Sequence, residues 1–312
     1  MVVVSTADDK FSLVLEQKDG MAFQDCREMN ILHVVPGLDV IGNGIAVAAK
    51  LIAAEQGTDL IEAQLFARGE GELDGYAEVW VHSCWLPMTI KACWRVLRAG
   101  KPLVRMTHAN LDPVRLRYHG WKKWLVGPIE RWCLRRCAKI VATCEAEKGW
   151  IERYLGPHCP PVEVTDIKRF FNLPQNDKID QTHFIISKSS SPIHILYLGR
   201  RHPLKGLEFL EAAVKGIEGV ELRVVSNAFG EEKEKVWEWC DVLVLPTLSD
   251  NFGLVIAEAL ERGKRVITTD GAPAWGEGND YGGRLMYLKG YRNGSPTERV
   301  RLLKDAIERF CK

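Results

Sequence analysis

The sequence predicts an α/β protein with two doubly wound domains that follow each other along the chain. Apolar runs of strand length alternate with helical patterns, at the spacing of parallel strands joined by crossover helices. The alternation fades between Pro157 and Ser191, where prolines and serines gather, and then starts again. A chain of 312 residues also exceeds one typical core and suits two compact domains. We expect these domains to occupy residues 1–175 and 176–312.

In the first domain, each short apolar run predicts a buried strand, and each longer stretch between two runs predicts a helix. The expected strands cover residues 31–36, 78–83, 102–108 and 139–144. The expected helices cover the alanine-rich residues 45–56, and then residues 89–99, 120–137 and 145–155. The second domain repeats the pattern, with expected strands at 193–198, 221–226, 242–246 and 265–269. Its expected helices lie at 207–215, 231–239 and 254–262.

Composition excludes several classes of protein. Apolar residues make up 46% of the chain and charged residues 27%, as in ordinary globular domains. No apolar stretch reaches the roughly 18 residues of a membrane-spanning helix, and residues 1–9 lack the basic flank of a secretory signal. The nine cysteines show no C-x-x-C spacing, so we expect buried thiols and a reducing, cytoplasmic location.

The candidates for function are the residues just beyond the expected strands, because ligands of open parallel sheets bind beyond the carboxyl ends of the strands. They are Gly42, Gly44, His82, His108 and Glu145 in the first domain, and Arg200, Lys205, Asp250 and Gly253 in the second. His33, by contrast, lies inside an expected strand, and we interpret it as structural.

The most informative segment, residues 242–253, leads from a buried strand through a polar loop to a helix that starts at Gly253 or Leu254. The free amides of a helix start bind anions, and glycine lets a phosphate approach the backbone. Glu258 then stands alone in an apolar stretch, where a ribose diol would satisfy its carboxylate. The alternative for Glu258 is an exposed side chain paired with Arg262 one turn later.

Two cations follow the first strand of the second domain. Arg200 can clamp a phosphate through two hydrogen bonds, and Lys205 adds a point charge at the head of the next helix. The alternative is a solvated basic loop, the commoner role of isolated cations. Because an anion-binding helix start is expected at the same end of the same domain, we favour a diphosphate site.

These motifs resemble those of glycosyltransferase family 4. The matching segments of the second domain are Gly199-Arg200, Lys205-Gly206, Pro246-Thr-Leu-Ser-Asp-Asn-Phe-Gly253, Ile256-Ala-Glu-Ala-Leu260 and Val266-Ile-Thr-Thr-Asp-Gly-Ala-Pro273. Asp250 and Glu258 have the spacing of the two acids of that family, which are separated by seven residues. Segments of the first domain around His82, His108 and Asp112 resemble members that build bacterial lipopolysaccharide and capsule. The resemblance runs from about Ile31 to Trp275.

The resemblance implies a GT-B fold, in which two Rossmann-like domains face each other across a cleft. It also implies sugar transfer with retention, without a bound metal or cofactor, from a nucleotide sugar that serves as co-substrate. The chain has no Asp-x-Asp pair, so the usual ligands of the metal-dependent alternative are missing from the sequence.

The resemblance further assigns roles to residues. The catalytic residues would be His108 near the reacting carbon, Asp250 facing the donor sugar, and Arg200 and Lys205 on the departing diphosphate. The donor would be bound by Gly42, Gly44, Arg200, Lys205, Asn251, Phe252, Gly253, Leu254 and, on the ribose, Glu258. The acceptor would meet His82 and Glu145. Ala109 stands where the family usually has glycine, which makes the backbone beside His108 less free.

Positive charge is concentrated from Arg95 to Lys139, a segment with twelve lysines and arginines but only two acids, Asp112 and Glu130. Within it, residues 120–138 mix tryptophans with cations along an expected helix. Such a helix can lie on an anionic membrane with its indoles at the headgroup level. The alternatives are nucleic acid, which a chain of net charge +1 disfavours, and a solvated helix whose tryptophans pack inward.

We therefore expect a metal-independent hexosyltransferase, peripherally associated with the inner face of the cytoplasmic membrane. It would move a sugar from a nucleotide-diphosphate sugar to a glycan or glycolipid acceptor of the lipopolysaccharide or capsule type, with no nucleic acid partner. Two alternatives stay open: a nucleotide-sugar epimerase on the same fold, and a catalytically silent sugar-nucleotide binder.

Overall fold

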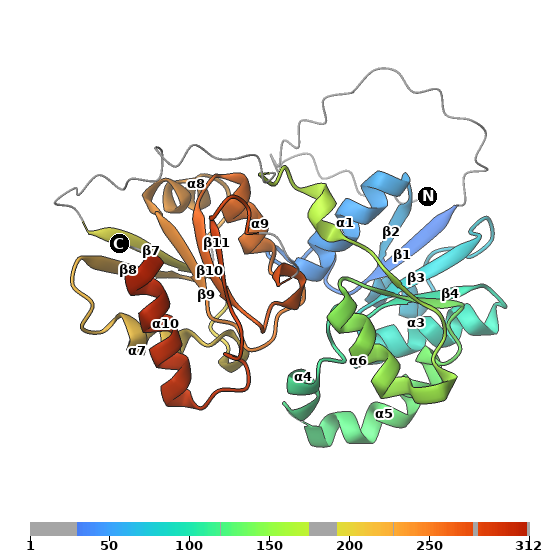
Figure 1. The fold of residues 1–312 in the computed structure, drawn as a ribbon. Coiled ribbons are helices and arrows are strands. Elements are labelled where there is room, and N and C mark those ends of the chain that lie inside the picture. The colour runs from blue at the N-terminus through green and yellow to red at the C-terminus, as the bar shows by residue number, and fades with distance from the viewer. Residues whose placement is uncertain (1–29, 119, 175–191, 227, 277–279, 311–312) are drawn as a thin grey trace.

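The computed structural model describes residues 30–118, 120–174, 192–226, 228–276 and 280–310. The first 29 residues and the expected domain boundary at 175–176 lie outside the described residues. Figure 1 shows two α/β units side by side, the first coloured blue to green and the second yellow to red. The fold class expected from the sequence is thus confirmed, because each unit is built on one parallel sheet with connecting helices.

The first unit has a six-stranded sheet in the order β2-β1-β3-β4-β5-β6, and all neighbouring strands are parallel. Its strands are β1 (Ile31–Val35), β2 (Asp59–Glu62), β3 (Glu78–His82), β4 (Leu103–Met106), β5 (Lys139–Ala142) and β6 (Val162–Val164). Its helices are α1 (Gly44–Gln56), α2 (Ala63–Arg68), α3 (Pro87–Arg98), α4 (Pro113–Arg117), α5 (Gly120–Leu134) and α6 (Glu145–Leu155). Strand β1 is buried at every position, as expected for a central strand with both faces covered.

The second unit has a five-stranded parallel sheet in the order β11-β10-β9-β7-β8. Its strands are β7 (Ile193–Leu198), β8 (Val220–Val225), β9 (Val242–Leu245), β10 (Arg265–Thr269) and β11 (Leu285–Leu288). Its helices are α7 (Leu207–Val214), α8 (Gly230–Trp239), α9 (Leu254–Glu261) and α10 (Pro296–Phe310). No described helix combines the length and the apolar character needed to cross a membrane.

The apolar cores of the two units are continuous. One cluster of buried residues contains Ala48 and Met106 of the first unit together with Leu245 and Ile256 of the second. Burial of apolar surface is the main stabilising contribution to folding. Part of the stability of the chain therefore comes from the contact between the units.

Some elements differ from the sequence expectation. Strand β6 pairs with β5 inside the segment that we interpreted as a connection between domains. It has only three residues with an exposed Glu163 at its centre, so no apolar run marks it. Strands β2 and β11 and helices α2, α4 and α10 were not predicted either. Their pairing and packing partners lie elsewhere in the fold, which overrides weak local patterns.

Candidate functional site

Two loops of the second unit are joined at the carboxyl end of its sheet. Leu204, in the loop after β7, accepts a hydrogen bond of 2.8 Å from the amide of Leu248 in the loop after β9. The Thr247 hydroxyl donates to the same carbonyl at 3.0 Å. Gly206 has a φ of 64°, and a Cβ there would lie 2.1 Å from the carbonyl oxygen of Pro246. Glycine is therefore required for this close approach, and the two loops form one structure.

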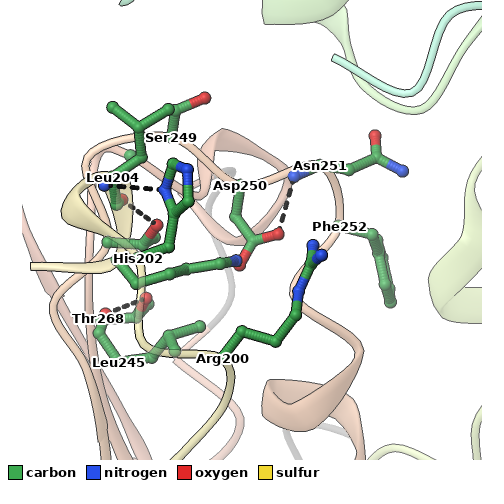
Figure 2. A network of polar contacts seen from close by, with 12 residues as sticks. Arg200, His202, Leu204, Leu245, Ser249, Asp250, Asn251, Phe252 and Thr268 are labelled. Carbon is green, nitrogen blue, oxygen red and sulfur yellow. Dashed lines mark hydrogen bonds and ion pairs between the residues drawn. The ribbon is translucent and has the colours of Figure 1, made fainter. Parts of the chain in front are cut away.

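The joined loops bring two predicted site residues, Lys205 and Asp250, into contact. The Lys205 ammonium forms an ion pair with the Asp250 carboxylate, which also accepts a hydrogen bond of 2.8 Å from the Asn251 amide. Burial raises the pKa of Asp250, but the Lys205 charge and hydrogen bond outweigh it and hold the pKa below the ordinary value. In Figure 2 the side chain of Arg200 extends towards the loop of Asp250 to Phe252.

The loop after β9 continues into helix α9, whose start faces the first unit. Gly253 precedes the helix in the left-handed conformation, with a φ of 69°, and no side chain caps the free amides. A Cβ on Gly44 would lie 3.5 Å from Leu254, and one on Gly42 would lie 3.2 Å from Phe229. The predicted glycine loop of the first unit therefore lies against the start of α9.

The other residues expected to bind the donor are placed less simply. The segment between β9 and α9, residues 246–253, is called the donor loop after this expectation. Phe252 is only 2% exposed, and its ring stacks on Phe171 at a centroid distance of 5.9 Å. Its carbonyl accepts a hydrogen bond from the Trp275 indole, so neither the ring nor this carbonyl is open to a ligand. Glu258 forms an ion pair of 2.7 Å with Lys233 of α8. The alternative pairing with Arg262 is wrong, because the Arg262 guanidinium binds Glu234 and the backbone carbonyl of Glu258.

His108 lies between the two units. One ring nitrogen is 2.9 Å from His82, and the other is 3.0 Å from the side-chain amide of Asn251. Burial, with a smaller contribution from the Arg115 charge, lowers the pKa of His108 to about 3. His108 is therefore neutral at physiological pH.

The two residues expected to contact the acceptor differ in burial. His82 is fully buried and bonded to His33 and His108, so it has no exposed surface to offer an acceptor. Glu145 is exposed at the first position of α6. The sequence analysis missed its neighbour Glu147, which is fully buried. Glu147 is the third residue of α6, a position from which glutamate commonly binds free backbone amides, and this signal could have found it.

A polar network missed by the sequence analysis joins the units beside the donor loop. Asp112 of the first unit accepts hydrogen bonds from Ser249 and from Arg292 of the second. Arg115 donates to Ser249 at 3.0 Å. The Asp112 side chain is fully buried, so each of these bonds satisfies a carboxylate that has little access to water.

The predicted basic helix is α5, and its tryptophans point outward. The exposed fractions are 65% for Trp121, 79% for Trp124 and 40% for Trp132. The inward-packing alternative is therefore wrong. The exposed apolar residues Leu125 and Ile129 share the helix with them, and the buried side chains of α5 are Glu130, Cys133 and Leu134.

Two further groups of residues bear on the sequence expectations. Cys133, Cys137 and Cys144 are buried, as expected, whereas Cys159 is only partly buried. Within the described ranges, no cluster of three or more histidine, cysteine or acidic side chains is placed to hold a metal ion.

The fold is similar to that of solved glycosyltransferases. Sucrose-phosphate synthase from Thermosynechococcus elongatus is 14% identical, with 91% of this chain and 90% of that chain covered and a TM-score of 0.64. HepE from Anabaena, in complex with UDP and glucose, is 15% identical, with 90% of each chain covered and a TM-score of 0.56. The UDP-forming α,α-trehalose-phosphate synthase from Burkholderia vietnamiensis is 10% identical, with 90% and 91% covered and a TM-score of 0.56. These likenesses identify the two-domain GT-B fold.

Family models match both units of the chain. Residues 63–166 match a glycosyl transferase 4-like domain, and residues 183–287 match the glycosyl transferases group 1. No curated protein matches the sequence. Because the two models together cover more than half of the chain in the order of its units, this protein belongs to the GT-B glycosyltransferases related to family 4.

Proposed function

We propose that this protein transfers a hexose, with retention, from a nucleoside-diphosphate sugar to a bacterial surface-glycan acceptor of the lipopolysaccharide or capsule type. The observation that carries the proposal is the meeting of three features at one end of the second sheet. They are the uncapped start of α9, the ion-paired Lys205 and the exposed Arg200, and they lie opposite the glycine loop of the first unit.

These features suit a diphosphate. The free amides of α9 and the two cations offer hydrogen bonds and positive charge where negative charge develops as the diphosphate departs. Lys205 already neutralises Asp250, so a bound phosphate would share this ammonium with the carboxylate. Asp250 would then face the donor sugar, and Glu258 would exchange Lys233 for the ribose hydroxyls or bind both. No step in this scheme calls for a metal ion or a cofactor.

The solved structures support a nucleotide donor. HepE was crystallised with UDP-glucose, and the Burkholderia vietnamiensis trehalose-phosphate synthase is UDP-forming. The residues of this chain around Asp250 and α9 would recognise the sugar and the base of the donor.

Helix α5 supports a membrane-bound acceptor. Its exposed tryptophans share the helix with exposed Lys122 and Arg131, and Arg136 lies over the Trp132 ring at 4.2 Å. An amphipathic surface that combines indoles and cations binds anionic bilayers. We infer peripheral association with the inner face of the cytoplasmic membrane, where a lipid-linked glycan acceptor would be presented.

A panel of nucleotide sugars tests the proposal. The protein is incubated with each donor, with and without lipid-linked glycan acceptors, and released nucleoside diphosphate and product anomers are measured. We expect release that requires an acceptor, is unchanged by a metal chelator, and yields a product with the donor's anomeric configuration. A modified but untransferred sugar nucleotide would indicate an epimerase, and binding without turnover would indicate a silent binder; either result overturns the proposal.

A further inference from the structure

A line of three buried histidines crosses the first unit, and the sequence analysis expects a catalytic role only for its last member. His33 lies in β1, His82 ends β3 and His108 follows β4, which are neighbouring strands of one sheet. Ring nitrogens 2.9 Å apart join His33 to His82, and another pair 2.9 Å apart joins His82 to His108. The exposed fraction is 0% for the first two and 1% for His108. We refer to His33, His82 and His108 as the histidine line.

The sheet register produces this line. His33 is paired with Trp80, and His82 lies two residues further along the chain. His82 is paired with Met106, and His108 again lies two residues further. Because side chains alternate between the faces of a strand, a step of two residues keeps each histidine on the face of the previous one.

Side-chain amides close both ends of the histidine line. Oε1 of Gln56, an exposed residue at the end of α1, lies 3.1 Å from Nε2 of His33. Nδ2 of Asn251, in the donor loop of the second unit, lies 3.0 Å from Nδ1 of His108. These two contacts alone correspond to rings that carry the proton on Nε2. A half-turn of a side-chain amide exchanges its oxygen and nitrogen, so each end can also take the opposite role.

The protons of the line have only two consistent arrangements. Burial lowers the pKa of His33 to about 4 and of His108 to about 3, and it lowers the pKa of His82 well below its ordinary value. A neutral imidazole carries one N–H, and each bond between two rings needs one N–H and one lone pair. The proton therefore lies on Nδ1 in all three rings or on Nε2 in all three.

Glu147 decides between the two arrangements. Its carboxylate accepts hydrogen bonds from the Thr107 hydroxyl, the Ala109 amide, and both the amide and the hydroxyl of Thr143, the last two at 2.8 and 2.7 Å. The single hydroxyl proton of Thr143 is therefore used. Yet Thr143 Oγ1 also lies 3.2 Å from Oδ1 of Asn251. Two oxygens at this distance need a proton between them, so the Asn251 amide is assigned the half-turned orientation, in which its nitrogen donates to Thr143 and its oxygen accepts from His108 Nδ1.

We infer that Gln56, His33 and His82 are positioning residues that hold His108 as its Nδ1–H tautomer, so that His108 offers the cleft a hydrogen-bond donor rather than a base. The inference rests on the proposed function together with the family resemblance, which places His108 near the reacting carbon. In this arrangement the Nδ1–H group of His108 donates to Oδ1 of Asn251, and the half-turned Gln56 amide donates from its nitrogen to Nε2 of His33. A substrate that displaces Asn251 would accept this hydrogen bond at a hydroxyl or phosphoryl oxygen. Gln56, His33 and His82 would keep the tautomer of His108 unchanged.

Nitrogen-15 NMR of histidine-labelled protein tests the tautomer without any activity measurement. The full chain is measured at pH 7, and the three signals are assigned by their loss in His33→Gln, His82→Gln and His108→Gln variants. We expect three neutral imidazoles with the proton on Nδ1. Protonation on Nε2, or a charged ring, would overturn the inference.

Substitutions of exposed Gln56 test the positioning role at a site remote from the reaction. Glutamate only accepts hydrogen bonds, so Gln56→Glu should draw the proton to His33 Nε2 and reverse the line. Lysine only donates, so Gln56→Lys should keep the Nδ1–H order. We expect kcat to fall about tenfold or more in Gln56→Glu and less than threefold in Gln56→Lys, with the donor KM little changed in both. Lys50→Glu places a carboxylate at another exposed position of α1 and serves as the charge control.

The outcomes are distinguishable. A fall in kcat in Gln56→Glu alone, accompanied by a switch to Nε2–H in the NMR spectrum, supports the inference. Equal kcat values in both variants, or an equal fall in Lys50→Glu, would exclude a positioning role. If no donor is turned over by the wild-type chain, the proposed function fails, whereas the NMR result still decides the tautomer.

Discussion

The backbone beside His108 is held in a conformation that its residues rarely adopt. His108 and Ala109 have φ values of 51° and 55°, in the left-handed region that costs a non-glycine residue about 1 kcal/mol. The expectation that Ala109 restricts this backbone is consistent with the geometry. The Ala109 amide donates to buried Glu147, and this hydrogen bond offsets part of the cost. Glu147, which was not among the predicted site residues, therefore stabilises the backbone beside His108, which was.

The charged residues expected to bind the donor give a first prediction. Lys205→Ala and Glu258→Ala should each reduce turnover about 10- to 100-fold, because a hydrogen bond to a charged group is worth about 1.5–3 kcal/mol. The matched controls are Arg201→Ala and Glu234→Ala, whose side chains are 63% and 56% exposed. We expect both controls to stay within about twofold of wild type by the same free-energy scale. Thermal unfolding checks that each variant is folded, and wild-type turnover in Lys205→Ala or Glu258→Ala would refute the site.

The buried histidines give a second prediction, on stability against pH. An unfolded histidine has a pKa of 6.5, whereas the pKa of His33 is about 4 in the fold. Below pH 6.5 the His33 ring binds a proton in the unfolded chain but not in the folded chain. The free energy of unfolding therefore falls as the pH decreases towards 4. The loss is about 1.4 kcal/mol per pH unit for each such histidine. Urea unfolding at pH 7, 6 and 5 measures it.

The window from pH 6.5 to 5 separates this effect from that of Asp250. The pKa of Asp250 lies below its ordinary value, so its contribution to stability is present above that value and is lost only at lower pH. A His33→Gln variant, which cannot titrate, should show a shallower decline than the wild type. A wild-type stability that stays constant between pH 6.5 and 5 would contradict the prediction.

At the scale of single elements, α5 shows how one helix serves two environments. Its inner side supplies Glu130, which forms a fully buried ion pair of 2.7 Å with Arg105. The two acids of the basic segment are thus both occupied, since Asp112 binds Arg292. The outer side of α5 therefore keeps its positive charge, together with the exposed indoles of Trp121 and Trp124.

Membrane binding by α5 gives a third prediction. The wild-type chain should bind vesicles of anionic lipid, and the binding should weaken as salt is added. Arg135→Gln combined with Arg136→Gln, at the two exposed positions directly after α5, should weaken it about 30-fold, on the order of 1 kcal/mol for each cation removed. Lys235→Gln, at an exposed position of α8, is the control. Sedimentation with vesicles measures the binding, and equal affinity for neutral and anionic vesicles would exclude an electrostatic membrane contact.

Across the whole molecule, the two units are joined by polar contacts between loops that follow their strands, as well as by the shared core. Asp112, Ser249, Arg115 and Arg292 form a network on one side of the donor loop. Asn251 of the second unit meets His108 on the other side. The donor loop is thus held from both sides, and a ligand that enters there must displace contacts between the units.

The Asp112–Arg292 pair gives a fourth prediction. Arg292→Ala removes the cationic partner of a fully buried carboxylate, and breaking a buried pair costs about 3–5 kcal/mol. Because this pair joins the units, we expect the cost to favour their separation. Small-angle scattering should then give a larger radius of gyration, with Arg301→Ala on the exposed side of α10 as the control. An unchanged radius would show that the shared core alone holds the units together.

The sequence by itself determined the alternation of strands and helices and the loops that carry the predicted donor site. Local patterns suffice for this, because apolar runs and helix starts depend only on residues that are close in the sequence. The positions of Arg200, Lys205 and Asp250 at strand ends followed directly, and the structure joins the last two in one ion pair.

Only the tertiary structure decided which distant side chains meet. The register of β1, β3 and β4 aligned His33 with His82 and His108, although His33 had been interpreted as merely structural. The packing of α6 against the sheet also buried Glu147, whereas Glu145 stayed exposed. The physical reason is that hydrogen bonds between strands depend on register and burial, and residues separated by 25 or more positions carry no local signal of either.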